Sequence, residues 1–273
     1  MGRSGTTRRW SRPELLLVMN LYCRIPFGRQ HSRAPEVVEL ARVLDRTPAS
    51  VAMKLGNLTA LDPEEKNRGV KGLSGASRLD REVWGEFSSD WEGVSAESER
   101  LWQKEVARQD LYRDVSVEPD GSPSAVSETT HSEGFFFGPT EGTSVSTVRL
   151  AQRFFRRTVL TAYHQRCCVS DNPVPELLIA SHILPWAEFP EQRSNPANGL
   201  CLSRIHDAAF DRGLLTFDRD FRVVLSKRLR DYLPHESVRA NFFVFEGNSL
   251  RFPEKFCPDP TFLEHHWKHV FQG

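Results

Sequence analysis

The stretch from Leu177 to Thr216 constrains the fold more than any other part of this 273-residue chain. It begins with a short apolar run that is typical of a buried strand and that ends on His182. A proline-rich loop then leads to Asn198, and a second apolar strand follows. His206 opens a helix with an apolar stripe, and Gly213 ends that helix. The order strand, loop, strand and helix predicts that His182, Asn198 and His206 converge on one spot.

Three short motifs follow one another at the end of this stretch. They are Asn-Gly-Leu-Cys-Leu at 198–202, His-Asp at 206–207 and Phe-Asp-Arg-Gly at 210–213. In this order they resemble one branch of the HNH endonuclease family. The resemblance implies a ββα-metal fold, in which two strands and a helix surround a metal ion. It covers residues 147–271 well and residues 10–86 more loosely.

The resemblance also implies a role for each of three residues. His182 would be the general base, and an imidazole of near-neutral pKa is well suited to take a proton from water. Asn198 would bridge backbone groups across the loop and hold His182 in line. His206 would bind the metal. A histidine at a strand end is more often a core residue, and one at a helix start can act as a cap, so the ordered motifs carry these assignments.

The implied cofactor is one divalent metal ion, Mg²⁺ or Mn²⁺, with Co²⁺ and Ni²⁺ as alternatives because imidazole is a softer ligand than Mg²⁺ prefers. Many family members have an acid or a second histidine just before the base, whereas this chain has Ser181. A neutral hydroxyl binds a cation weakly. The expected metal ligands are therefore His206, Ser181 and Asp207, while Asp211 is expected to pair with Arg212 or a loop amide.

Three helices are predicted near the amino terminus, beginning at Ser11, near Pro35 and after Thr47. Two short helices joined by a tight turn, after a packing helix, resemble the helix-turn-helix class, whose last helix meets the major groove of DNA. The apolar spacing leaves two polar side chains on the outer face of the third helix, Lys54 and Asn57.

Lys54, Asn57 and Arg46 are therefore the predicted DNA contacts of the amino-terminal part, since amides can read adenine and cations can hold phosphates. The alternative is a small helical domain in which these side chains are solvated. In the carboxy-terminal part the candidate phosphate contacts are Arg193, Arg204 and Arg212. We expect one or two of them to bind phosphate.

Composition divides the chain into three parts: a helical, DNA-binding domain at 1–113, an acidic linker rich in Ser and Gly at 114–146, and the HNH domain at 147–273. Residues 1–86 carry 15 Lys and Arg against 10 Asp and Glu, and residues 147–231 carry 13 against 9. Residues 87–146 carry 4 against 12. Two basic blocks around an acidic spacer favour two parts that face nucleic acid, although ordinary charge heterogeneity gives the same pattern. No role is predicted for Phe135–Phe137, which interrupt the linker.

The HNH domain is predicted to begin with an amphipathic helix from Thr147 to His164. Two β-hairpins are expected after the motifs: one from Leu214–Phe217 with Phe221–Leu225, and one from Phe242–Phe245 with Ser249–Phe252. A closing helix is expected from about residue 260 to 271.

We therefore predict an α+β chain, with a helical, helix-turn-helix-like domain before a ββα-metal HNH domain. The predicted function is metal-dependent endonucleolytic cleavage of DNA, with double-stranded DNA as the expected substrate. The predicted biological role is restriction or phage defence, with modified DNA as a candidate target. One alternative is a DNA-binding regulator with an inert HNH scaffold, which Ser181 favours; another is a structure-specific or RNA nuclease.

Five scattered cysteines indicate a reducing, cytoplasmic setting. No apolar run approaches the length of a membrane span, so no membrane partner is expected; a homodimer stays open.

Overall fold

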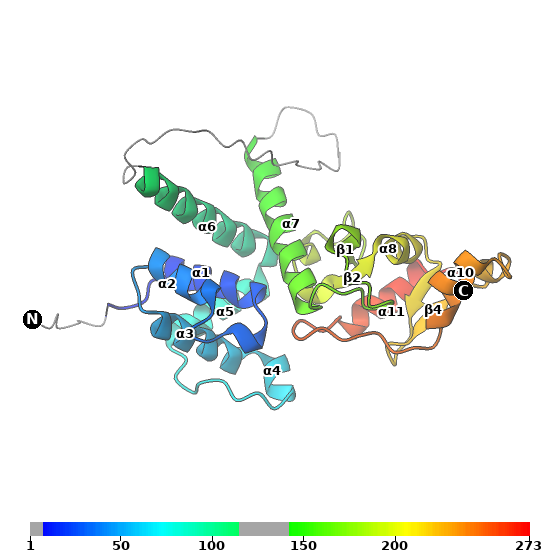
Figure 1. Ribbon diagram of the computed structural model, residues 1–273, viewed down its shortest axis with the longest axis horizontal. Coiled ribbons are helices and arrows are strands. Elements are labelled where there is room, and N and C mark those ends of the chain that lie inside the picture. Colours follow the sequence, from blue (N-terminus) through cyan, green and yellow to red (C-terminus); the bar gives the residue numbers. More distant parts are fainter. Residues whose placement is uncertain (1–7, 115–141) are drawn as a thin grey trace, which may run out of the picture.

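The computed structural model describes residues 8–114 and 142–273, with side chains for 8–105 and 147–273. Most of the predicted linker, with Phe135–Phe137, lies outside the described residues. Helices predominate and two small antiparallel sheets accompany them, so the predicted α+β class is confirmed (Figure 1). Within the described residues, every helix is too short or too polar to cross a bilayer.

The N-terminal lobe is built from helices that pack around α1. In chain order they are α1 (Arg12–Arg24), α2 (Pro35–Val43), α3 (Pro48–Leu61), α4 (Pro63–Asn67), α5 (Arg78–Ser89) and α6 (Trp91–Asp114). The three predicted helix starts are confirmed. Ser11 and Glu14 form a capping box before α1, and the hydroxyl of Thr47 accepts a hydrogen bond from the Ser50 amide at the start of α3.

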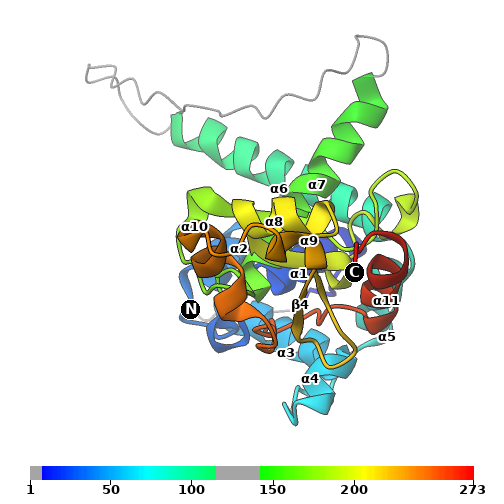
Figure 2. The same ribbon diagram turned by 90° about the vertical axis from the view of Figure 1, so that its right-hand side faces the viewer.

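The C-terminal lobe follows α7 (Gly142–Ala162) and contains both sheets (Figure 2). Its elements are β1 (Leu178–His182), β2 (Gly199–Ser203), α8 (Arg204–Asp211), β3 (Leu215–Phe217), β4 (Val223–Leu225), α9 (Lys227–Arg230), α10 (Glu236–Asn241) and α11 (Pro260–His269). The first predicted hairpin is present as β3 and β4.

The second predicted hairpin was wrong. Residues 242–245 follow α10 as a 3-10 turn, Phe243–Phe245, because Phe242 caps that helix by donating its backbone N–H to the Val238 carbonyl. Ser249 instead makes an isolated bridge to Arg222, beside β4. Apolar alternation alone does not distinguish a strand from a short aromatic turn packed on a core.

The pairing of β1 with β2 positions every residue of the predicted site. The strands are antiparallel, with His182 opposite Gly199 at one end and Leu178 opposite Ser203 at the other. Helix α8 starts directly after Ser203. His182 and the start of α8 therefore lie at opposite ends of this hairpin.

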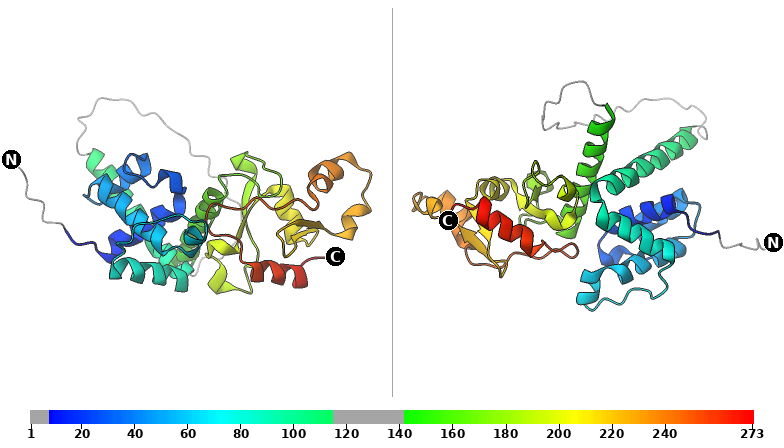
Figure 3. Two further views of the ribbon diagram at one scale, coloured as in Figure 1. Left: turned by 90° about the horizontal axis from the view of Figure 1, so that it is seen from below. Right: turned by 180° about the vertical axis from the view of Figure 1, so that it is seen from behind.

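Helix α7 lies between the two lobes (Figure 3). Its side chains take part in two separate hydrophobic cores. Phe154 packs in the core of the N-terminal lobe, against Phe87 at a ring-centroid distance of 5.9 Å. Its neighbour Phe155 packs in the core of the C-terminal lobe. Two adjacent side chains of α7 are thus buried in different lobes, and α7 packs against both lobes.

A second connection ties the lobes through Lys255, which is buried. Its ammonium group donates hydrogen bonds to the carbonyls of Tyr22 and Ile25, at 2.9 and 3.1 Å, at the carboxyl end of α1. It also lies 3.8 Å from the centre of the Tyr22 ring. A cation at a helix carboxyl terminus is stabilised by the orphan carbonyls and by the helix dipole. The segment before α11 is therefore held on the N-terminal lobe.

Replacing Gly213 by alanine should destabilise the fold. Gly213 has φ +65, and an added Cβ would lie 2.0 Å from the Val270 carbonyl oxygen. Gly247 is a matched control, since it has φ +78 but nothing within 4 Å of the added atom. Backbone strain alone is worth about 1–3 kcal/mol. We expect Gly213→Ala to lower the free energy of unfolding in urea clearly more than Gly247→Ala; equal losses would mean that the contact with Val270 relaxes freely.

Candidate active site

The ring of His182 is held from three sides at the end of β1. Its Nε2 lies 2.8 Å from the carbonyl oxygen of Arg193. The ring of Phe155 stacks on it at 4.0 Å with an interplanar angle of 9°, and Trp186 meets it edge-on at 5.1 Å. These contacts come from α7 and from the loop between β1 and β2, so the loop and the long helix together define where the imidazole sits.

The hydrogen bond to Arg193 determines the tautomer of His182. A carbonyl oxygen can only accept, so Nε2 carries the hydrogen and Nδ1 keeps its lone pair. Nδ1 has no hydrogen-bond partner within the described residues. Burial lowers the pKa of His182 below its usual value, so the ring is neutral at physiological pH. A neutral imidazole with one unused basic nitrogen has the form that a general base requires.

Asn198 makes the loop-spanning contacts that the sequence predicts for it. Its side-chain oxygen accepts a hydrogen bond from the Leu184 amide at 2.8 Å, and its nitrogen donates to the Gln192 carbonyl at 3.0 Å. The backbone carbonyl of Asn198 also accepts from the Ile183 amide at 3.0 Å. Gln192 directly precedes Arg193, so the buried amide of Asn198 fixes the backbone that orients His182.

Arg193 brings a cation next to this ring. Its Nε donates to the Trp186 carbonyl at 2.8 Å, and its guanidinium carbon lies 4.8 Å from the centre of the Trp186 ring. Among the described residues, no carboxylate pairs with this guanidinium. Its remaining N–H groups are suited to a bidentate contact with phosphate, which is the geometry that guanidinium favours.

His206 is a buried structural tie at the other end of the hairpin. Its Nδ1 lies 2.8 Å from the Ser203 hydroxyl and 3.5 Å from the Cys167 thiol. Its Nε2 lies 2.8 Å from the carbonyl oxygen of Asn241, so Nε2 is the donor and Nδ1 accepts from Ser203. The residue is 2% exposed. Nε2 carries the hydrogen and the lone pair of Nδ1 accepts from Ser203, so neither ring nitrogen is available to a metal.

The predicted convergence of His182 and His206 is not found. Four residue steps of β1 separate His182 from Leu178, the partner of Ser203, which is about 13 Å along the strand. The rings have no contact residue in common. His182 touches α7 and the loop, whereas His206 touches Cys167 and the segment around Asn241.

The predicted metal ligands His206, Ser181 and Asp207 do not fit a divalent cation in this arrangement. Side chains alternate along a strand, so Ser181 projects from the face of the hairpin opposite to Ser203, to which His206 is bonded. The Ser181 hydroxyl is buried and unpartnered. Across residues 8–105 and 147–273, no group of three or more His, Cys, Asp or Glu side chains lies close enough to hold an ion. These ligands were expected from the family resemblance and from their positions in the chain, neither of which reveals side-chain direction.

Two of the predicted DNA contacts in the N-terminal lobe, Lys54 and Asn57, are buried, so the predicted outer face of α3 was wrong. The Lys54 ammonium group lies 2.9 Å from each carboxylate oxygen of Asp80, and the Asn57 amide donates to Asp80 at 3.3 Å. Asp80 belongs to α5, which covers this face. A capping box at Ser77 explains the position of Asp80, because the carboxylate also accepts from the Ser77 amide.

Arg46 is also unavailable to DNA. Its side chain is 8% exposed and pairs with the carboxylate of Glu14 at 2.9 Å. Its guanidinium carbon lies 3.8 Å from the centre of the Trp10 ring. Burial acts to raise the pKa of Glu14, but the hydrogen bonds from Arg46 and Ser11 outweigh it and lower this pKa to about 2. Arg46 therefore locks the turn before α3 onto the start of α1.

Arg204 and Arg212, the other predicted phosphate contacts, are exposed at the two ends of α8. Arg204 donates to the Glu176 carbonyl at 3.4 Å, and Arg212 donates to the Ala208 carbonyl at 3.1 Å. Of the three candidate arginines in this lobe, only Arg193 contacts the surroundings of His182. Phe155 was missed as a site residue, because apolar spacing marks it as buried without revealing that its partner is a histidine.

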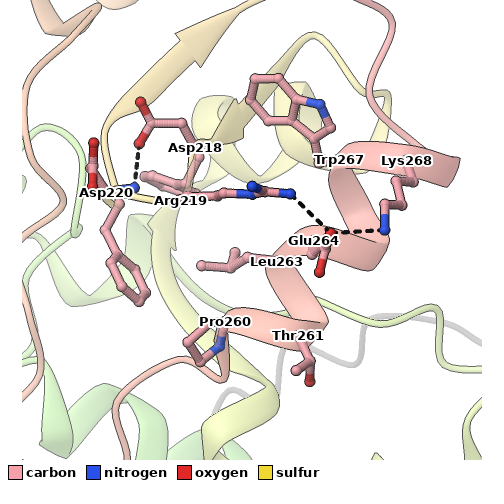
Figure 4. A pocket seen from close by; sticks show the side chains of 11 residues that line it. Asp218, Arg219, Asp220, Pro260, Thr261, Leu263, Glu264, Trp267 and Lys268 are labelled. Carbon is pink, nitrogen blue, oxygen red and sulfur yellow. Dashed lines mark hydrogen bonds and ion pairs between the residues drawn. The ribbon is translucent and has the colours of Figure 1, made fainter.

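A separate cavity of about 730 Å³ lies between the β3–β4 turn and α11 (Figure 4). Trp267 forms part of its wall, and neither His182 nor His206 lines it. The two cations in the wall, Arg219 and Lys268, both pair with Glu264, at 3.4 and 2.8 Å. Three carboxylates, those of Asp218, Asp220 and Glu264, line the cavity against these two cations, so it does not have the character of a phosphate site.

The strand–loop–strand–helix order of β1, β2 and α8, with a histidine at the end of the first strand, is the arrangement expected of a ββα nuclease domain. The sequence model of the HNH endonucleases matches residues 167–218, which include β1, β2 and α8. This part of the chain is therefore similar to the HNH endonucleases. HNH endonucleases cleave nucleic acid and generally use a divalent metal ion. A search of curated proteins finds no match to the chain.

Lys54 and Asp80 should behave as a buried structural pair. Lys54→Met leaves the Asp80 carboxylate buried without its cation, which should lower the free energy of unfolding by about 3–5 kcal/mol. Adding Asp80→Asn removes the unpaired charge and should restore much of the loss. Urea unfolding measures both. A DNA contact is excluded if the folded double variant binds DNA with wild-type affinity and salt dependence; weaker binding with a smaller salt slope would support the original prediction.

His206→Ala should destabilise the protein without altering a metal response. Removing a buried ring and two hydrogen bonds should cost about 2–5 kcal/mol in urea unfolding. Ser203→Ala keeps the imidazole and should cost about 1 kcal/mol. A ligand that binds the native state raises its melting temperature. We therefore expect the Mn²⁺-dependent shift in Tm to be the same in wild type and His206→Ala; a shift confined to wild type would make His206 a ligand.

Proposed function

We propose that the chain is a DNA endonuclease in which His182 is the general base. The observation that carries this proposal is the carbonyl-fixed tautomer of His182, with its unused Nδ1, inside the segment that matches the HNH family. Nδ1 takes a proton from water as the water oxygen bonds to phosphorus. The bond from phosphorus to the 3′ oxygen breaks and the departing oxygen takes a proton from solvent, which leaves 5′-phosphate and 3′-hydroxyl ends.

Arg193 and Asn198 support this step in different ways. The Arg193 guanidinium binds the scissile phosphate and offsets the negative charge that develops on it. Asn198 does no chemistry but keeps the loop in place, so the Arg193 carbonyl stays on Nε2. The metal that the family generally uses is assigned no residues here, because the predicted ligands do not fit one.

The substrate we propose is double-stranded DNA, and the biological role is restriction or phage defence, with modified DNA as a candidate target. The pairing of a helical lobe with an HNH domain supports this role by analogy only. All five cysteines are free thiols, which supports a cytoplasmic location. Cleavage of methylated and unmethylated phage DNA under identical conditions distinguishes general from modification-dependent cutting.

A DNA-binding regulator with an inert HNH scaffold is the second candidate. Its support is that Ser181 projects from the opposite face of the hairpin to Ser203 and that both ring nitrogens of His206 are bonded to protein, which leaves the predicted metal site unassembled. Such a protein would bind DNA without cutting it at any concentration of Mg²⁺ or Mn²⁺. A structure-specific or RNA nuclease is separated from both by a panel of duplex, branched and RNA substrates.

His182→Ala should abolish most of the nicking of supercoiled plasmid. Loss of a general base typically costs about 10²- to 10⁴-fold in rate. His31→Ala is the control, because that histidine is exposed in the loop between α1 and α2. Assays should run in Mg²⁺, in Mn²⁺ and in EDTA, and ligation of the products tests for 5′-phosphate ends. Cutting by His182→Ala at the wild-type rate would remove His182 from the mechanism.

A further inference from the structure

We propose that Phe155 is the positioning residue for His182: its stacked ring fixes the plane of the imidazole and so aims Nδ1 at the attacking water. This inference rests on the proposed function of His182. The HNH family match begins at residue 167, so it does not include Phe155. The residue lies on α7, outside the strand–loop–strand–helix unit.

The hydrogen bond to Arg193 alone cannot orient the base. It fixes the position of Nε2, but the imidazole can still turn about the line from Nε2 to the carbonyl oxygen, and this rotation moves Nδ1. A parallel ring at 4.0 Å with an interplanar angle of 9° removes that freedom. Trp186, which is edge-on at 5.1 Å, limits the same motion from another side. The Arg193 carbonyl determines the tautomer of His182, and the stacked ring of Phe155 determines the direction in which Nδ1 points.

The position of Phe155 is itself fixed by Gly199, the strand partner of His182. A Cβ at position 199 would lie 2.4 Å from Val159 Cγ2 and 3.0 Å from Phe155 Cζ. The ring of Phe155 can therefore cover the His182–Gly199 pair only because residue 199 has no side chain. In sequence, the Gly after Asn198 can be interpreted as a turn residue. In the structure it is a strand residue with ordinary φ that makes room for the stacking ring.

Such a constraint matters because a catalytic group displaced by about 1 Å can lose about 10²-fold in rate. Phe155 itself touches no phosphate, so its effect should fall on kcat and not on DNA binding. Phe154 offers a matched control on the same helix. It is as fully buried as Phe155 but packs in the core of the N-terminal lobe, against Phe87 and Trp91.

The test compares Phe155→Leu with Phe154→Leu in full-length protein, using plasmid nicking and urea unfolding. Both variants should lose stability. We expect kcat to fall about 10- to 100-fold in Phe155→Leu, with KM changed less than about twofold, and to stay near wild type in folded Phe154→Leu. Equal kcat values in the two folded variants would overturn the proposal.

A second pair of variants separates positioning from stability. Gly199→Ala should push the Phe155 ring off His182 and lower both stability and kcat. Adding both Val159→Ala and Phe155→Leu removes the two side-chain contacts of the new methyl group, so the triple variant should regain stability but not kcat. Recovery of kcat together with stability would show that Phe155 only fills space.

A spectroscopic readout keeps this inference distinct from the proposed function. A ring stacked face to face shifts the His182 ring-proton resonances upfield, and NMR should show that shift lost in Phe155→Leu and retained in Phe154→Leu. If wild type cuts DNA, His182→Ala does not, and Phe155→Leu keeps its kcat, the inference fails alone. If wild type does not cut any substrate, the proposed function fails, and a His182 shift that is unchanged in Phe155→Leu then overturns the stacking as well.

Discussion

The antiparallel register of β1 and β2 is the constraint on which the rest of the C-terminal lobe depends. It places His182 opposite Gly199, which lets Phe155 lie over the pair, and it places Ser203 where α8 begins. Because side chains alternate along a strand, a slip by one residue would turn His182 to the other face and break every contact of the site. Asn198 protects this register, since its side chain and backbone hold both ends of the connecting loop.

The two lobes act as one support for that hairpin. Helix α7 divides its aromatic pair between the two cores, and Lys255 ties the segment before α11 to the carboxyl end of α1. Burial lowers the pKa of Lys255 to about 8, so placing the ammonium group there costs free energy that the carbonyls and the Tyr22 ring offset. These contacts of α7 and Lys255 hold the two lobes together. They also restrict the movement of α7, the helix that carries Phe155.

Local patterns predicted the elements well, whereas side-chain direction largely escaped them. The caps at Ser11 and Thr47, the strand before His182 and the helix at His206 follow from signals within a few residues, and all are present. The burial of Lys54 depends on Asp80, which is 26 residues further on, and no period in α3 contains that information. In the same way, the apolar spacing predicted that Phe155 is buried but not that it stacks on His182, because stacking partners are set by tertiary packing.

The two histidines of the motif show what separates a chemical role from a structural one. A neutral imidazole can accept at one nitrogen and donate at the other. His206 uses both, accepting from the Ser203 hydroxyl and donating to the Asn241 carbonyl, and thereby joins β2 and α8 to the end of α10. His182 uses one, and its second nitrogen has no protein partner among the described residues. The motif marks both residues equally. The ring nitrogen that the fold leaves unused is the reason why the proposed mechanism gives the proton transfer to His182 and not to His206.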